Sequence, residues 1–334
     1  MTQIKGRFAP SPSGRMHLGN VFCALLAWLS IRSQGGSLLL RIEDLDPARC
    51  RRSYAEQLEN DLRWLGLLWD EGGIHASGSY APYCQSQRSA IYERMLTQIS
   101  EQTQLYPCFC SRDELHAASA PHHSDGRLLY SGHCRSLTTA QQAALSESRQ
   151  PALRIAVPDE IFSFRDKSGC FFSENLCAGC GDFIVRRSDG VFAYQLAVVV
   201  DDALMGVTEV VRGRDLLNST PRQLFLYRAL GFAPPEFGHL PLLLSADGRR
   251  LSKRDRDLDM GILRQRFTAP ELLGRLAFLA GLIDQPEPTT AQELIAHFSW
   301  RALPDKDITV PSALFSVQSL LKAEILEECT LNRS

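Results

Sequence analysis

Residues 9–20 read APSPSGRMHLGN, a turn rich in proline and glycine that runs directly into a long apolar segment. The prolines and the glycine end the short strand expected at residues 6–9. From His17 to Leu29 the apolar side chains recur at helical spacing, and SLLLRIED (37–44) is an apolar run typical of a buried parallel strand. The stretch therefore predicts a strand–loop–helix–strand unit, whose helix N-terminus suits a phosphate.

The rest of the sequence continues as an alternation of helices and strands. SYAE (53–56) fits a capping box before a helix that carries Leu58, Leu62 and Leu65. We expect further helices at residues 86–101, 221–232 and 269–282, and strands at 152–157, 182–187, 192–200, 207–212 and 239–244. Residues 105–150 are rich in Cys, His, Ser and Ala with little periodicity, and we interpret them as an insertion.

Composition narrows the class of protein. Of 334 residues, 44% are hydrophobic and 22% charged, as in ordinary globular proteins. The sequence begins without the apolar core of a signal peptide, and it has no apolar run of the roughly 20 residues that span a membrane. We therefore expect a cytoplasmic protein with no membrane contact, in which the ten cysteines are thiols or metal ligands rather than disulfides.

Charge leaves two interpretations open. The net charge of -2 does not indicate a nucleic-acid partner. Arginines nevertheless cluster at residues 49–52, and a second basic cluster lies at 249–256. Each cluster is either a solvated face or a contact to phosphates.

Two short motifs indicate the chemistry. HLGN (17–20) resembles the HIGH signature of class I aminoacyl-tRNA synthetases, with asparagine in place of the last histidine. RLSKR (250–254) resembles their mobile KMSKS loop, with arginine in place of the first lysine and the last serine. A compact ammonium suits the negative charge that develops on departing pyrophosphate. The resemblance implies that His17 and Lys253 are catalytic and that ATP is bound by His17, Gly19, Asn20, Ser252 and Lys253.

Three longer stretches specify the branch of that class. RFAPSPSG (7–14), RIEDLDPAR (41–49) and FAYQLAVVVDDALMGVTEVVRGRDLL (192–217) closely resemble the glutamyl-tRNA synthetase group. The resemblance implies that L-glutamate is bound by Arg7, Phe8, Ala9, Pro10, Ser11, Glu43, Tyr194 and Arg212. Two arginines and one carboxylate match a substrate with two carboxylates and one ammonium. The alternative is that Glu43 and Arg212 pair with each other inside the fold.

Cysteines in the expected insertion indicate a metal site. In CFC (108–110) two thiolates can share one metal, and YSGHC (130–134) supplies a third. Zinc usually takes four ligands, and His116 and His133 are candidates by residue type. The glutamyl group carries a Cys-x-Cys…Tyr-x-x-x-Cys pattern here. That resemblance implies one structural zinc ion held by Cys108, Cys110, Tyr130 and Cys134; the alternative is free thiols.

A second cysteine pair, CAGC (177–180), lies near Cys170. A Cys-x-x-Cys pair can indicate metal or redox chemistry. We interpret these three cysteines as plain thiols, because the sequence offers no fourth ligand at suitable spacing and no thioredoxin-like context.

Lys253 lies within the last quarter of the sequence, whereas glutamyl-tRNA synthetases carry a long anticodon-binding region beyond their KMSKS loop. The sequence therefore resembles the paralogous family of glutamyl-queuosine tRNA(Asp) synthetases. That resemblance implies activation of L-glutamate by ATP with Mg²⁺ and transfer of the glutamyl group to queuosine, at the wobble position of tRNA(Asp), by a monomer. The alternatives are a shortened glutamyl-tRNA synthetase that charges tRNA(Glu) and a non-catalytic, zinc-containing RNA-binding module.

These observations predict an α/β protein with a Rossmann-type parallel nucleotide-binding domain, a zinc-containing insertion and a small helical C-terminal domain. The expected boundaries place the first half of the catalytic domain at residues 1–103 and the insertion at 104–190. The second half of the catalytic domain follows at 191–245, and the KMSKS-like loop and helical domain at 246–334.

Overall fold

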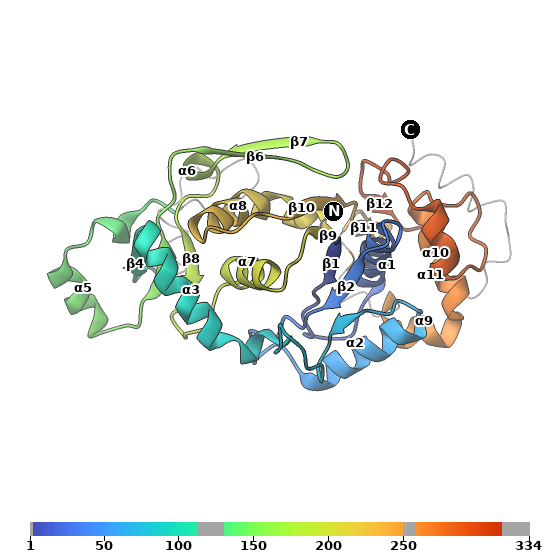
Figure 1. The fold of residues 1–334 in the computed structure, drawn as a ribbon, viewed down its shortest axis with the longest axis horizontal. Coiled ribbons are helices and arrows are strands. Elements are labelled where there is room, and N and C mark those ends of the chain that lie inside the picture. The colour runs from blue at the N-terminus through green and yellow to red at the C-terminus, as the bar shows by residue number, and fades with distance from the viewer. Residues whose placement is uncertain (1–2, 112–129, 250, 252–257, 316–334) are drawn as a thin grey trace.

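The computed structural model describes residues 3–111, 130–249, 251 and 258–315. Its central element is a parallel sheet in the spatial order β10-β9-β1-β2-β3 (Figure 1). The strands are β1 (Lys5–Phe8), β2 (Ser37–Leu40), β3 (Glu71–Gly72), β9 (Glu209–Gly213) and β10 (Glu236–Leu240). The chain builds the sheet to one side of β1 and later to the other, so a topological switch point lies between β1 and β9. The expected Rossmann-type parallel sheet is confirmed.

Helix α1 (Leu18–Arg32) joins β1 to β2 and confirms the unit expected at the start of the sequence. It is buried on almost every side, including Trp28, because it packs between the sheet and the helices near the end of the described chain. The helix ends at Arg32, and Gly35 follows in the left-handed conformation with φ +67°, which a side chain would disfavour.

The capping box expected at residues 53–56 is wrong. Helix α2 (Arg52–Trp64) begins two residues earlier than that box requires, and its N-cap Arg51 makes no side-chain capping bond. The backbone N–H of Arg51 instead donates to the Pro12 carbonyl (3.0 Å), so the loop before α1 positions the start of α2. The expected apolar face is confirmed, because Leu58, Leu62 and Leu65 are buried.

The strand expected at residues 192–200 is also wrong, because the segment forms helix α7 (Tyr194–Leu204). Every residue from 196 to 202 is buried, so the sequence shows no polar face at helical spacing. Its run of valines resembles a strand instead. The helix packs against α3 (Ser89–Gln102) and α8 (Thr220–Ala229), which confirm the helices expected near those positions.

The single strand expected at residues 239–244 is interrupted. Strand β10 ends at Leu240, and β11 (Leu243–Leu244) pairs with β12 (Ile308–Thr309) in a separate sheet. Pro241 lies at the break and cannot donate a ladder hydrogen bond.

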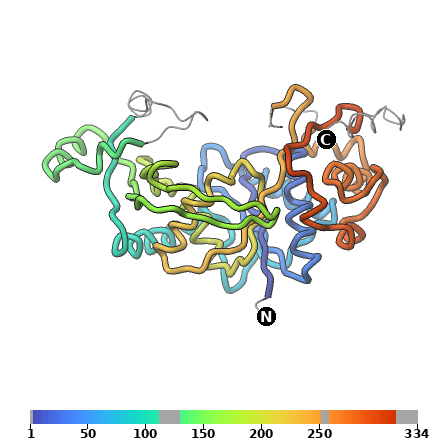
Figure 2. Tube along the Cα trace, turned by 90° about the horizontal axis from the view of Figure 1, so that it is seen from above, coloured from blue at the N-terminus to red at the C-terminus, as the bar shows by residue number. Residues whose placement is uncertain are grey.

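The described residues between 105 and 186 form smaller elements beside the parallel sheet. Strands β4 (Leu105–Cys108), β5 (Ala152–Ile155) and β8 (Phe183–Arg186) make an antiparallel sheet, and α5 (Thr139–Ser146) lies beyond it. A hairpin of β6 (Ile161–Arg165) and β7 (Phe171–Asn175), which the sequence did not indicate, is followed by α6 (Leu176–Gly179). The hairpin runs back past α8 toward the parallel sheet (Figures 1 and 2).

Helices α9 (Met260–Arg266), α10 (Ala269–Leu279) and α11 (Ala291–Leu294) follow the parallel sheet. Thr268 caps α10 through a capping box with Glu271, and the apolar side of α10 joins the core around α1. Short 3₁₀ turns occur at Gln85–Gln87, His133–Ser136, Arg214–Ser219, Ile295–His297 and Ser312–Phe315. Within the described ranges, no helix combines the length and apolarity that crossing a membrane requires.

Candidate active site

A cavity of about 400 Å³ opens at the carboxyl ends of β1 and β9, at the topological switch point of the sheet. It is lined by all of the residues expected to bind glutamate, namely Arg7, Phe8, Ala9, Pro10, Ser11, Glu43, Tyr194 and Arg212, and also by His17, Gly19 and Asn20. The buried Leu251 also lines it. Ser252 and Lys253 lie outside the described residues.

Arg7 lies near the end of β1, and its guanidinium is buried between β9 and α7. Its Nη1 donates to the Val211 carbonyl (2.9 Å), and its Nε lies 3.6 Å from Asp202 Oδ1. That Nε makes no hydrogen bond to a described residue. The charge of Arg7 is thus only partly balanced by the fold.

Glu43 is paired with Arg41 and not with Arg212. Arg41 Nη2 donates to Glu43 Oε1 (3.1 Å), and Arg41 Nη1 donates to Asp202 (2.6 Å). Burial raises the pKa of Glu43, and the charges of Arg41 and Arg7 offset only part of that effect. A further cation in this cavity would favour the ionised form of the Glu43 carboxylate.

Arg212, on β9, is held by neutral groups. Its guanidinium donates to Gln223 Oε1 (2.7 Å), Thr220 Oγ1 (2.9 Å) and His239 Nε2 (3.1 Å). No carboxylate of the described residues lies within ion-pair distance of it. Burial lowers the pKa of Arg212, and repulsion from Arg7 lowers it further. An anionic ligand would offset both effects.

Tyr194 is the first residue of α7 and faces the same cavity. Burial raises the pKa of its phenol, and the nearby Glu43 carboxylate raises it further. The phenol is therefore neutral and remains a hydrogen-bond donor at physiological pH.

The turn at residues 9–20 places a closed hydrogen-bonded cap at the start of α1. His17 is the N-cap residue; its Nδ1 accepts from the Gly19 N–H (3.1 Å), while Asn20 Oδ1 accepts from the His17 N–H (3.1 Å). A neutral His17 ring that accepts at Nδ1 carries its proton on Nε2. Asparagine at position 20 therefore completes the cap. A Cβ at Gly19 would lie 3.1 Å from His17 Cε1, so glycine also makes room for this ring.

Sequence reasoning missed the residues that support the site. Arg41 and Asp202 lie within the stretches that carry the family resemblance, but only the fold shows them joined to Arg7 and Glu43. His239 and Gln223, which hold Arg212, had no sequence signal. A lone histidine or glutamine gains this role only from strands and helices that are distant in sequence.

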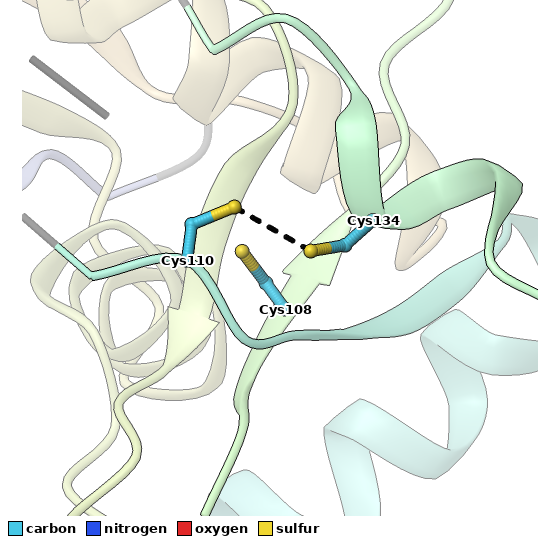
Figure 3. Close-up of side chains that lie close together, drawn as sticks. All are labelled: Cys108, Cys110 and Cys134. Carbon is cyan, nitrogen blue, oxygen red and sulfur yellow. Dashed lines mark hydrogen bonds between the residues drawn. The ribbon is translucent and has the colours of Figure 1, made fainter. Parts of the chain in front are cut away.

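The expected metal-binding cysteines also converge. The Sγ atoms of Cys108, Cys110 and Cys134 all lie within 4.8 Å of one another, and those of Cys110 and Cys134 are 3.5 Å apart (Figure 3). The Tyr130 hydroxyl lies 3.6 Å from Cys108 Sγ and accepts from the Cys134 N–H (2.8 Å). Thiolates around one zinc ion, each about 2.3 Å from it, lie at comparable spacing.

The surroundings of Cys108 and Cys110 shift the pKa values of the two thiols in opposite directions. Burial disfavours the thiolate of Cys108, but the Arg154 guanidinium outweighs it and lowers the pKa of that thiol. Burial and the neighbouring Cys134 thiol raise the pKa of Cys110 to about 12. His133 is exposed, and His116 lies outside the described residues.

The second cysteine pair has different surroundings. Cys170 and Cys177 are exposed, and burial raises the pKa of Cys180 to about 12. Cys180 is therefore a protonated thiol at neutral pH.

The two basic clusters differ in how far the structure describes them. Arg49, Arg51 and Arg52 are exposed beside the start of α2. Of the second cluster, Arg249 is exposed, and most of the rest lies outside the described residues.

Comparison with known proteins places this site in a family. Residues 3–309 match the catalytic domain of the class I tRNA synthetases for E and Q, and the chain belongs to this family. It is 51% identical to the Glutamyl-Q tRNA(Asp) synthetase of Symbiobacterium thermophilum, over 94% of this chain and 98% of that protein. It is 45% identical to Glutamate–tRNA ligase 2 of Alkalilimnicola ehrlichii, over 84% of this chain but 59% of that protein.

A solved structure shows the same fold. The crystal structure of a glutamate-tRNA synthetase from Elizabethkingia anophelis superposes with a TM-score of 0.80 at 29% identity. The match covers 93% of this chain and 69% of that one.

Proposed function

We propose that this protein activates L-glutamate with ATP and transfers the glutamyl group to queuosine in the anticodon of tRNA(Asp). One observation carries the proposal. The chain aligns with 98% of a relative named Glutamyl-Q tRNA(Asp) synthetase, at 51% identity, but with 59% of a glutamate–tRNA ligase, at 45%. The cavity lined by Arg7, Glu43 and Arg212 supports glutamate as the amino acid.

Each group in the cavity has a proposed task. Arg7 and Arg212 bind the substrate carboxylates, Glu43 binds the α-ammonium, and Tyr194 donates from the opposite wall, with the backbone of residues 8–11 as the floor. The α-carboxylate then attacks the α-phosphorus of ATP. A P–O bond forms as the bond to the pyrophosphate oxygen breaks, and the adenylate and pyrophosphate result.

The phosphates of ATP are proposed to bind at the start of α1 and at the KMSKS-like residues that follow β11. The His17 Nε2–H donates to a phosphate oxygen near the helix N-terminus, with Gly19 and Asn20 shaping the turn. Ser252 and Lys253 complete the ATP site, the ammonium of Lys253 following the charge onto pyrophosphate. ATP enters as its Mg²⁺ complex.

The cysteine cluster is proposed to hold one structural zinc ion, with Cys108, Cys110, Cys134 and Tyr130 as ligands. Such an ion would tie the end of β4 to the turn at His133–Ser136. We assign residues 104–190 to this insertion and 246–334 to the loop and helical C-terminal domain. The exposed arginines at 49–52 are proposed to contact RNA phosphates, and the protein to act as a cytoplasmic monomer.

The activation half of the proposal is tested by exchange of labelled pyrophosphate into ATP without RNA. We expect exchange with L-glutamate, because the residues proposed to bind it line the cavity without any contribution from RNA. L-Glutamine serves as the control and should support little exchange, since it lacks the side-chain carboxylate that an arginine would bind. Strict dependence on added tRNA(Glu) would favour a conventional glutamate–tRNA ligase.

A further inference from the structure

A histidine on the neighbouring strand holds Arg212 in place. His239, on β10, is 5% exposed, and its Nε2 accepts from Arg212 Nε–H (3.1 Å). The Thr220 hydroxyl lies 3.3 Å from the same ring nitrogen. To accept from Arg212, Nε2 must offer a lone pair, so the ring proton belongs on Nδ1. The hydrogen bond that orients Arg212 therefore exists only while His239 keeps this tautomer.

An aspartate fixes that tautomer. His239 Nδ1 lies 2.6 Å from Asp166 Oδ2, and Asp166 is also buried. The other oxygen, Oδ1, accepts from the backbone N–H groups of Ser168 (3.0 Å) and His239 (3.3 Å). Burial raises the pKa of Asp166, but the bonds from His239 and Ser168 outweigh it and leave the pKa below its ordinary value. The carboxylate is therefore an acceptor whose two oxygens have fixed partners.

Asp166 belongs to the turn of the β6–β7 hairpin and not to the parallel sheet. The next residue anchors that turn, because the Lys167 N–H donates to the Phe237 carbonyl (2.9 Å) and its Nζ pairs with Glu209 (2.6 Å) and Glu236 (3.1 Å). The far end of the hairpin leads back to the antiparallel sheet that carries the cysteine cluster (Figures 1 and 2). One turn thus joins two parts of the molecule at the glutamate cavity.

We propose that Asp166 and His239 are positioning residues for Arg212. Through them, the turn of the β6–β7 hairpin orients the guanidinium that binds the substrate carboxylate. The inference rests on the proposed binding of glutamate by Arg212. Described partners take the Nε–H, both Nη2 donors and one Nη1 donor of Arg212. One Nη1 donor remains for a ligand, and its direction depends on the bond to His239.

The substitution Asp166→Asn tests the chain of hydrogen bonds from Asp166 through His239 to Arg212, with almost no change in side-chain shape. The backbone N–H groups of Ser168 and His239 require an oxygen at the Oδ1 position, so the new amide NH₂ must occupy the Oδ2 position. It then donates to His239 Nδ1, which must become an acceptor. The ring proton moves to Nε2 and faces the Arg212 Nε–H, so two donors meet and Arg212 must turn away.

We expect Asp166→Asn to raise the KM for glutamate about 10-fold to 100-fold in RNA-free pyrophosphate exchange, the effect of losing a buried hydrogen bond. The KM for ATP should stay unchanged, because the phosphate-binding residues lie on α1 and after β11. The matched control is Asp159→Asn at the other end of the same hairpin, where the exposed Asp159 accepts from Asn175. It should leave both KM values unchanged.

Two substitutions of His239 separate positioning from simple packing. The amide oxygen of His239→Gln can take the place of Nε2 and accept from Arg212, whereas His239→Asn reaches only toward Asp166. We expect the glutamine variant to keep a glutamate KM near that of the wild type and the asparagine variant to match Asp166→Asn. Circular dichroism and melting temperature identify the folded variants, on which the comparison is made.

An unchanged glutamate KM in folded Asp166→Asn would overturn the inference, and so would equal rises in its KM values for glutamate and ATP. Equal rises in the glutamate KM of the two folded His239 variants would overturn it as well. Failure of the proposed function is a different result, because wild-type protein would then show no glutamate-dependent exchange at all.

Discussion

Two buried arginines, Arg7 and Arg212, line the cavity proposed for glutamate, and the fold balances their charges differently. Arg41 shares Asp202 with Arg7 and also holds Glu43, whereas Arg212 has only neutral partners among the described residues. Burial and the charge of Arg7 lower the pKa of Arg212. A substrate carboxylate would relieve that cost, which makes Arg212 the residue most directly tied to ligand charge.

Replacement of Arg212 by lysine tests this assignment, because it keeps the charge and removes the planar fork. Lysine cannot donate to His239, Gln223 and Thr220 together with a ligand. We expect Arg212→Lys to raise the KM for glutamate about 100-fold in pyrophosphate exchange. Arg214→Lys is the matched control, since Arg214 pairs with Asp307 instead. A glutamate KM equal to that of the wild type would contradict the role given to Arg212.

Sequence resemblance identified residues that line the cavity but not the ones that hold them in place. Arg7, Glu43, Tyr194 and Arg212 belong to recognisable motifs, and the fold brings them to one cavity. His239 and Asp166 are 73 positions apart and have no motif. Their pairing follows from the docking of a hairpin on β10, which local sequence cannot reveal.

At the scale of elements, the opening turn was predictable because proline and glycine act locally. The loop after β1 and the start of α1 appear where the sequence places them. Two other expectations failed where tertiary contacts decided the outcome, because Arg51 is held by Pro12 and α7 is buried all round. A third failed for a local reason, since β10 ends before Pro241. The β6–β7 hairpin was missed because its strands mix exposed apolar and polar residues.

The cysteine cluster gives an element-scale prediction. Purified protein should contain one zinc ion per chain, and Cys134→Ser should release it, because the Sγ of Cys134 faces those of Cys108 and Cys110. The end of β4 should then loosen, and RNA transfer should suffer more than pyrophosphate exchange. Metal analysis by mass spectrometry measures the zinc. Cys177→Ser, at an exposed thiol, is the control and should keep the metal. Full zinc retention in Cys134→Ser would exclude this ligand set.

In the whole molecule, the cavity proposed for glutamate lies at the switch point of a parallel sheet, and a hairpin from the cysteine-bearing region docks beside it. The exposed Arg49 and Arg51 lie in the segment after β2 that also carries Glu43, and the exposed Arg52 begins α2. Basic side chains there would position RNA through its phosphates without reading its sequence. Discrimination between RNAs would then depend on which nucleophile reaches the adenylate.

The most direct test of the account is incubation of the protein with ATP, labelled glutamate and tRNA(Asp) from cells that make queuosine or from cells that do not. We predict label only in the queuosine-containing tRNA, and mass analysis of its nucleosides should show a glutamyl group on queuosine. Prior removal of the 3′-terminal adenosine should leave that labelling intact. Equal labelling of both tRNA pools, or loss of label from tRNA that lacks its 3′-terminal adenosine, would place glutamate on the 3′ end and contradict the account.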